Sequence, residues 1–434
     1  MQRKNLTMFR NFVKINLVKL TIINRINKRS GGKLKKILAL IMSATLVMSL
    51  AGCSGKAKGT TTPAPAAGEI IIGGLQDLSG GSSVSGVAMD RGAQMAVKEI
   101  NDKGGINGKK IKYISYDTKG TPQEGLNAYT RLVDQDKAVA VVGPPISNIG
   151  LALTETAAQK KVPIVGAFID SRVTKKEDGK PQDYMFLVQP TNQQSGTIQA
   201  GYLVDELGLK KVALFYDKTN AFGVSQVEAF KAYVLANGGE IVEEQVFKSG
   251  DVDFKTQLNK IKESGAEAIF APNYPKDNTL YCTQLNQLGM SNIVTMGGLE
   301  FAPPFLTTLP DPTLVDNVYF ALNVAFDDPK LADLNQSYLD TYTEAKSVDD
   351  ISVKVYLGYD AIRLIAEAIK NTTGNITGEA VKAGLEGIEG FDALPGKIGF
   401  SPESHQPIGL TMVMYKISKG VNEKIGPYVP EVLK

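Results

Sequence analysis

The sequence predicts an α/β protein whose strands and helices form doubly wound parallel sheets. Short apolar runs such as 70–72 alternate along the chain with segments whose apolar residues recur at helical spacing. One run, 138–142, is continuously apolar, which is typical of a strand covered on both faces in a parallel sheet. Residues 69–434 are also numerous enough for two domains of ordinary size.

A first series of alternating strands and helices is predicted over residues 70–168. Val97 and Ile100 fall on one face of its first helix. Thr121 and Pro122 open the next helix, because Thr caps a helix N-terminus and Pro suits the first turn. The strands expected here are 70–72, 111–116, 138–142 and 163–168.

A second series is predicted over residues 195–271. It starts with a helix at 195–207, and a later helix carries Phe230 and Val234 on one face. The late helix 353–370 is apolar along one face, which indicates that the chain returns to pack against the first sheet. The strands expected in this series are 212–216, 241–247 and 268–271.

The first 52 residues contain eleven Lys or Arg and neither Asp nor Glu, and they end in the uncharged run 37–50. This run is shorter than the roughly 20 residues that span a bilayer, and small residues follow it. We interpret it as a cleaved export signal rather than as a transmembrane anchor. The segment 50–53 resembles the bacterial lipobox, which implies that Cys53 becomes the lipidated first residue. Residues 53–68, rich in Gly, Thr, Pro and Ala, then form a flexible tether.

Removal of the leader reverses the sign of the net charge. The whole chain carries 48 basic and 45 acidic residues, a net +3, whereas without the leader 37 basic residues face 45 acidic ones, a net −8. A nucleic-acid partner therefore loses its electrostatic support. Cys282, the other cysteine, cannot pair with an acylated Cys53 and is expected to be a buried, inert thiol on a helix.

Several short segments, in order and suitably spaced over residues 69–418, resemble the leucine/isoleucine/valine-binding proteins of ABC importers, which have the type I periplasmic-binding-protein fold. Each segment is weak alone, but together they are specific. They are Asp77-Leu78-Ser79-Gly80, the stretch 92–108, Val141-Val142-Gly143-Pro144, Phe215-Tyr216-Asp217 with Phe222-Gly223, Leu357-Gly358-Tyr359-Asp360-Ala361 and Gly399-Phe400-Ser401-Pro402.

The resemblance implies two doubly wound, three-layer α/β lobes joined by a hinge of three strands. The N-terminal lobe would comprise residues 69–189 and 324–397, and the C-terminal lobe residues 190–323 and 398–434. It also implies a monomeric extracytoplasmic binding protein, lipid-anchored on the outer face of the cell membrane. Such a protein needs no cofactor or metal, and it passes a small ligand, here expected to be an amino acid, to the permease of an ABC importer.

The first candidate binding loop follows the strand at 70–72. In open α/β sheets, ligands bind at the carboxyl ends of strands, where helix N-termini present free amide groups. The loop 79–86 carries three Gly and four Ser, so a ligand could approach its backbone, and Ser79 and Ser85 are candidates. Its glycines have the spacing of a phosphate loop, but Val87 stands in place of the Lys, which argues against nucleotide binding.

Two further loops of the first series carry candidates. Ser147 and Asn148 follow the most apolar strand; Ser147 could cap the next helix, and the resemblance implies that it binds the α-carboxylate of an amino acid. A plain helix cap is the alternative. The loop after Phe168 departs from the family, because Asp170 stands where the branched-chain binders have a Thr. A carboxylate repels an anion, so either Asp170 points away or the ligand presents a cation or hydroxyl groups there.

The second series contributes Phe222, Tyr274 and Glu300, which are similar in position to the family's aromatic walls and its ammonium-binding acid. Aromatic faces supply apolar area and can hold a cation. A carboxylate adds a charge-assisted hydrogen bond of about 1.5–3 kcal/mol. The alternatives are core positions for the two aromatic residues and a solvated loop for Glu300.

Other functions have less support in the sequence. There is no nucleophile elbow, no cluster with metal-ligand spacing and no dinucleotide fingerprint, and the sole histidine, His405, lies in a hydrophilic turn expected at the surface. An enzyme is therefore disfavoured. The ligand could instead be an amide, urea or an aromatic acid, and the protein could sense its ligand and signal through a partner.

Overall fold

The computed structural model describes residues 68–248, 250–408 and 412–433. Within these ranges, none of the helices is long and apolar enough to cross a membrane. The predicted export signal, the lipidated Cys53 and the tether up to residue 67 lie outside the described residues.

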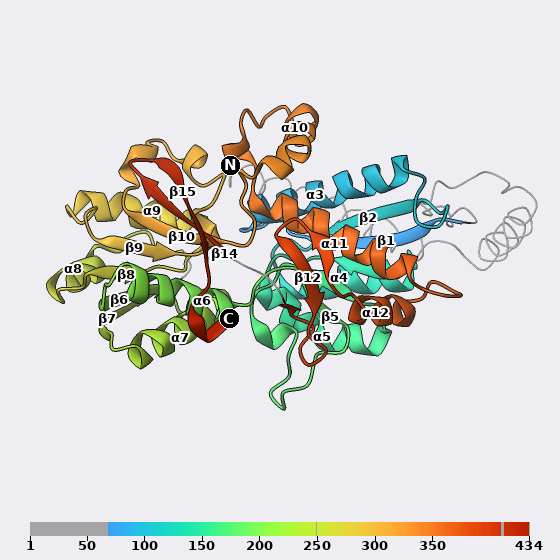
Figure 1. The fold of residues 1–434 in the computed structure, drawn as a ribbon, viewed down its shortest axis with the longest axis horizontal. Helices are drawn as coiled ribbons and strands as arrows, with labels where there is room; N and C mark the ends of the chain where they lie inside the picture. The colour runs from blue at the N-terminus through green and yellow to red at the C-terminus, as the bar shows by residue number, and fades with distance from the viewer. Residues whose placement is uncertain (1–67, 249, 409–411, 434) are drawn as a thin grey trace, which may run out of the picture. The chain divides into compact units, whose positions relative to one another are not determined.

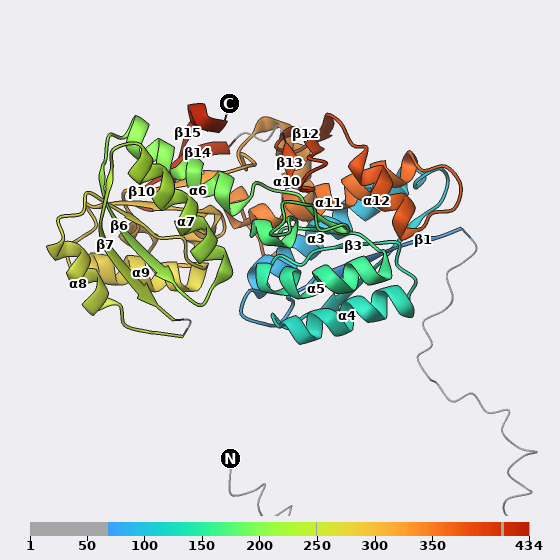
Figure 2. The same ribbon diagram turned by 90° about the horizontal axis from the view of Figure 1, so that it is seen from below.

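The first sheet has five parallel strands with helices on both faces (Figure 1). Ile70 and Ile72 pack beneath α3 (Ser83–Asp102), whereas Ile71 and Leu75 pack beneath α4 (Pro122–Asp134) and α5 (Ser147–Lys160), which lie together on the other face (Figure 2). Side chains of successive residues in a strand point to opposite faces, which explains this split. In spatial order the strands are β2 (Ile111–Asp117), β1 (Ile70–Gln76), β3 (Ala140–Val142), β4 (Ile164–Gly166) and β5 (Met185–Leu187).

The second sheet has seven strands, and one of them, β14 (Met412–Ser418), the second from one edge, runs antiparallel to the other six. One face packs on α6 (Asn192–Gly201), which continues as a π turn, and on α7 (Ala221–Ala236); the other packs on α8 (Lys255–Glu263) and α9 (Pro275–Gln287). In spatial order the strands are β7 (Glu240–Phe247), β6 (Lys211–Asp217), β8 (Ala268–Phe270), β9 (Val294–Gly297), β10 (Val318–Leu322), β14 (Met412–Ser418) and β15 (Val421–Tyr428).

Both predicted series of strands and helices are confirmed, with boundaries that differ by a few residues. Thr121 caps α4 as expected, since its hydroxyl oxygen accepts the N–H of Glu124 at 3.4 Å. The buried thiol is confirmed as well: Cys282 lies on α9 at 4 % exposure, and burial raises its pKa to about 12. A thiol with such a pKa stays protonated and unreactive at neutral pH.

The late helix α11 (Val353–Lys370) begins and ends where the sequence predicts, and it lies along α3 (Figure 1). Its first turns pack elsewhere: Val353, Val355 and Tyr356 belong to the core beneath the second sheet, whereas Leu357 and later residues belong to the first. The helix therefore connects the two cores, and its N-terminus lies where they meet.

A third sheet of three short antiparallel strands lies beside β5, where the Leu187 N–H donates to the His405 oxygen at 3.2 Å. The predicted lobe boundary between residues 397 and 398 falls inside one of these strands, because antiparallel pairing keeps 396–408 together. The division of the chain into lobes stays a prediction. The strands are β11 (Phe391–Ala393), β12 (Gly396–Phe400) and β13 (Pro407–Ile408), and the remaining helices are α10 (Ala332–Thr341) and α12 (Gly378–Glu386).

The expectation that His405 lies at the surface is wrong. It is 1 % exposed, its ring stacks on Phe186 with 4.2 Å between centroids, and its two nitrogens lie 3.2 Å from the Gln182 oxygen and 3.1 Å from Glu386 Oε1. Gln182 and Glu386, both outside the hydrophilic turn, bring polar atoms to the imidazole, so the ring can be buried with both nitrogens in hydrogen bonds.

His405 is expected to make folding sensitive to acid. Burial lowers its pKa below the ordinary value of about 6.5, although Glu386 acts in the opposite direction. When the folded-state pKa is lowered, the unfolded chain binds the proton first as the pH falls below about 6.5. The free energy of unfolding is therefore highest above pH 6.5 and decreases below it by up to about 1.4 kcal/mol per pH unit. Because His405 is the only histidine, its NMR signal can be followed without assignment. A titration midpoint at or above 6.5 in the folded protein would contradict the prediction, and His405→Asn should lose the acid sensitivity.

Candidate functional site

The loop after β1 is held by two aspartates. Asp77 is fully buried and accepts the N–H groups of Gly80 at 2.6 Å and Ser82 at 2.8 Å. The Ser79 hydroxyl donates to Asp117 at 2.5 Å, so this candidate side chain is engaged within the protein. Helix α3 begins at Ser83, so the second half of the predicted glycine loop is its first turn, and the loop is shorter than expected.

Ser147 and Asn148 are the first two residues of α5. Ser147 is 4 % exposed and does not cap the helix, so the expected cap is wrong; instead its hydroxyl oxygen accepts the N–H groups of Ile169 at 3.2 Å and Asp170 at 3.3 Å. Asn148 is exposed. Phe168 is fully buried in the core beneath α5. The hydroxyl of Ser147 therefore connects the N-terminus of α5 to the loop after β4.

Asp170 has its own counter-ion. Its carboxylate is fully buried and accepts Arg172 Nε at 3.0 Å, Arg172 Nη2 at 2.5 Å and the Arg172 backbone N–H at 3.0 Å. Such a two-pronged ion pair neutralises the carboxylate, which removes the repulsion that the sequence suggested. Arg172 was missed in the sequence, although its position two residues after Asp170 in a tight turn allows the contact.

Phe222 and Tyr274 face each other at the start of α7 and just before α9. Their rings stack with 5.6 Å between centroids; Phe222 is 3 % exposed and Tyr274 is half-buried. Burial, and after it the charge of Glu300, raises the pKa of the Tyr274 hydroxyl. The two aromatic candidates therefore form one apolar wall, with the acid nearby.

Glu300 lies in a short 3₁₀ turn (Leu299–Phe301) directly after β9 and is only 9 % exposed. A solvated loop, the alternative in the sequence, is thus excluded. Burial raises its pKa to about 7, while the nearby Lys354 acts in the opposite direction. Its Oε2 accepts no hydrogen bond from any described residue. Burying a carboxylate oxygen without a hydrogen-bond partner costs free energy. A cation or a hydrogen-bond donor from a ligand would remove that cost.

Lys354 is the second residue that the sequence did not single out. It lies in the first turn of α11 at 5 % exposure, where burial lowers its pKa and Glu300 acts in the opposite direction. One signal was available: a lysine in the first turn opposes the helix dipole, which favours acidic residues there. Its proximity to Glu300 could come only from the tertiary structure.

A cavity of about 220 Å³ contains three of these residues, Ser85, Glu300 and Lys354. Apolar residues such as Pro303 and Phe305 form much of its wall. Ser147, Asp170, Phe222 and Tyr274 do not line it, so the structure does not gather the candidates around one cavity; Ser147 contacts Asp170, and Phe222 stacks on Tyr274.

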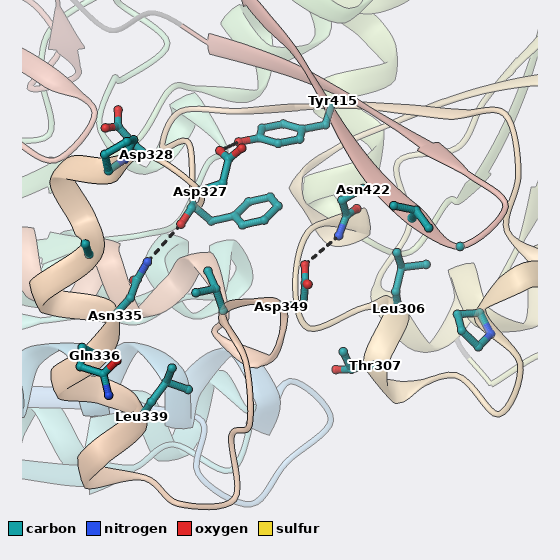
Figure 3. Close-up of a pocket in the computed structure, with 17 residues that line it drawn as sticks. Leu306, Thr307, Asp327, Asp328, Asn335, Gln336, Leu339, Asp349, Tyr415 and Asn422 are labelled. Atoms are coloured by element: carbon teal, nitrogen blue, oxygen red, sulfur yellow. Dashed lines mark hydrogen bonds between the residues drawn. The ribbon is translucent and has the colours of Figure 1, made fainter.

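A larger cavity of about 760 Å³ lies between α10 and β15 and contains no predicted site residue (Figure 3). Its acids are partly engaged: Asp327 accepts the Tyr415 hydroxyl at 2.5 Å and pairs with Lys424 at 3.3 Å, and Asp349 accepts the Asn422 amide at 3.3 Å. Size alone therefore does not identify the binding site. In the described part of the chain, no group of three or more His, Cys, Asp or Glu side chains could hold a metal ion.

Two doubly wound α/β sheets, with candidate residues at strand ends and helix N-termini of both, define a type I solute-binding protein. The chain belongs to the periplasmic binding protein family, whose model matches residues 69–421. This family is a class of solute-binding proteins, not of enzymes; its members act outside the cytoplasm, bind small molecules and work with the permeases of ABC transporters.

Individual relatives agree with this family. The branched-chain amino acid transporter substrate binding protein LivJ from Streptococcus pneumoniae, solved in complex with isoleucine, is 28 % identical with a TM-score of 0.73, covering 83 % of this chain and 100 % of that protein. An amino acid binding protein from Pseudomonas aeruginosa is 26 % identical over 80 % of this chain and 87 % of its own length. A solute binding protein from Rhodopseudomonas palustris, in complex with 3,4-dihydroxybenzoic acid, is 22 % identical with a TM-score of 0.72 over 83 % of this chain and 98 % of that protein, and so supports the fold.

Proposed function

We propose that this protein captures an amino acid, branched-chain or related, and delivers it to the permease of an ABC importer. The observation that carries the proposal is Glu300, a buried carboxylate with a free oxygen, whose charge also acts on the hydroxyl of Tyr274. A ligand ammonium is the group that such an acid and ring bind best, through a charge-assisted hydrogen bond and a cation–π contact. The names of LivJ and of the Pseudomonas protein point to the same class of ligand.

The opposite end of the ligand would meet the N-terminus of α5. Ser147 lies there with Asp170 neutralised by Arg172, so a ligand carboxylate finds helix amides without a facing negative charge. Ser79, Asn148 and Phe168 have weaker support, since Ser79 donates to Asp117 and Phe168 is a core residue. We propose that two lobes close on the bound ligand, and that the permease recognises the closed state.

The remaining parts of the proposal concern the cell envelope. Cys53 would carry the lipid that anchors the protein to the outer face of the membrane, with residues 53–68 as the tether. The protein would act as a monomer, because one chain contributes all of the candidate residues. A sensing role through a partner protein is the alternative to transport.

The test is a thermal-shift screen of the chain beginning at Cys53 against amino acids, amides, urea, polyamines and aromatic acids. A ligand at 100 times its dissociation constant stabilises the folded state by about 2.7 kcal/mol, which is easily detected. Stabilisation by at least one amino acid is expected. The proposal fails if an amide, urea or an aromatic acid stabilises the protein and no amino acid does.

A further inference from the structure

Lys354 is a buried residue whose ammonium has no close partner. Of the lysines in the described part of the chain, only Lys354 is buried. Its Nζ forms no hydrogen bond, and no ion pair within 4.0 Å, with any described residue, and its charge interacts with Glu300 from farther away. Removing an ammonium from water without a close partner is unfavourable, so an anion that reaches it is bound strongly.

The cavity that Lys354 lines also lies at three helix N-termini. Val84 and Ser85 belong to the first turn of α3, Pro275 and Lys276 to that of α9, and Lys354 to that of α11. Each N-terminus carries partial positive charge. The Lys354 N–H already donates to Ser352 Oγ at 3.3 Å and Pro275 has no N–H, so it is this partial charge that favours an anion. The helices have 20, 13 and 18 residues.

Glu300 is the only acid that lines this cavity, against two lysines and three helix N-termini. Proline and phenylalanine side chains form much of its wall, and although Val84 and Lys276 are exposed, Glu300 and Lys354 are buried, which strengthens the electrostatic interactions of these two groups. The cavity therefore favours a negatively charged group next to a positive or hydrogen-bond-donating one that meets Glu300.

We propose that Lys354 is a specificity-determining residue, and that the protein selects amino acids with an acidic side chain. The side-chain carboxylate lies against Lys354 and the N-terminus of α11, and the ammonium lies against Glu300. This inference rests on the proposed function, because it takes the ligand to be an amino acid. The volume of about 220 Å³ equals that of roughly seven water molecules at about 30 Å³ each, which suits such a small metabolite.

The experiment is calorimetric titration of the chain beginning at Cys53 with L-aspartate, L-glutamate, L-leucine and L-isoleucine. Wild type is expected to bind at least one acidic amino acid more tightly than both neutral ones. Lys354→Met is expected to weaken binding of the acidic ligand about 10- to 100-fold, because a charge-assisted contact is lost. The affinity for leucine should not decrease. Lys370→Met, at the exposed C-terminal end of the same helix, is the matched control and should bind like wild type.

Tighter binding of leucine or isoleucine by wild type overturns the inference, and this result needs no variant to fold. An unchanged ratio of acidic to neutral affinities in a folded Lys354→Met protein overturns it too. In both cases the proposed function stands, since an amino acid is still bound. If none of the four amino acids binds, the inference fails; the proposed function fails with it if no amino acid stabilises the protein in the thermal-shift screen either.

Discussion

Replacing Gly358 by valine is expected to destabilise the folded protein by about 3 kcal/mol or more, at the upper end for overpacked cores. A Cβ at Gly358 would lie 2.0 Å from the oxygen of Met89 in α3, and one at Gly92 would lie 1.9 Å from the oxygen of Val355 in α11. The two helices thus cross backbone against backbone, and a helix backbone cannot yield as the end of a side chain does.

Urea unfolding checks this prediction, with a lower midpoint and an unchanged slope as the expected result. Gly81→Ala is the control, because a Cβ at Gly81 meets no atom within 4 Å and should leave the midpoint almost unchanged. Equal midpoints for wild type and Gly358→Val would show that α3 and α11 do not touch as described.

Replacing Glu300 by glutamine is expected to weaken amino-acid binding about 10- to 100-fold, equivalent to about 1.5–3 kcal/mol. Glutamine keeps the shape but loses the negative charge that pairs with an ammonium. Because burial outweighs Lys354 and makes the ionised Glu300 unfavourable in the empty site, the neutral glutamine should not lower the thermal stability without ligand.

The pH dependence of binding gives a second check on Glu300. Burial raises its pKa to about 7, with Lys354 acting against this shift. The ionised form binds an ammonium better, so the affinity of wild type should fall as the pH is lowered through about 7. Titrations at pH 8 and pH 6 measure this, and Glu300→Gln should lose the dependence. The control is Glu263→Gln, at an exposed residue of α8, which should show the same pH dependence as wild type. If the affinity depends neither on pH nor on the Glu300→Gln substitution, Glu300 is not part of the binding site.

The secondary structure could be predicted because local patterns decide it. Thr121 and Pro122 open α4, and α11 covers Val353–Lys370 as its apolar face indicates. His405 shows where local patterns fail: its turn is hydrophilic, yet Phe186 and Glu386, distant in sequence, enclose the ring. The polarity of a residue's sequence neighbours does not determine whether segments distant in sequence pack against it.

The candidate site shows the same limit. Position after a strand was enough to single out Ser147 and Asp170, because strand ends and helix N-termini follow from the βα order, whereas Glu300 was singled out by the resemblance to the family. Their partners were not visible, since hydrogen bonds to Ser147 and the charge near Glu300 come from segments 22 and 54 residues away in the chain.

The sequence by itself determined the alternation of strands and helices, the family and the residue types at the strand ends, all of which depend on short-range patterns and on ordered motifs. Only the tertiary structure decided the electrostatic character of the site. Asp170 is neutralised by Arg172, and Lys354 lies beside Glu300 in a cavity at three helix N-termini. The physical reason is that the energy of a charged group depends on its burial and on its distances to other charges and hydrogen-bond partners. These are set only when separate elements of the chain pack together.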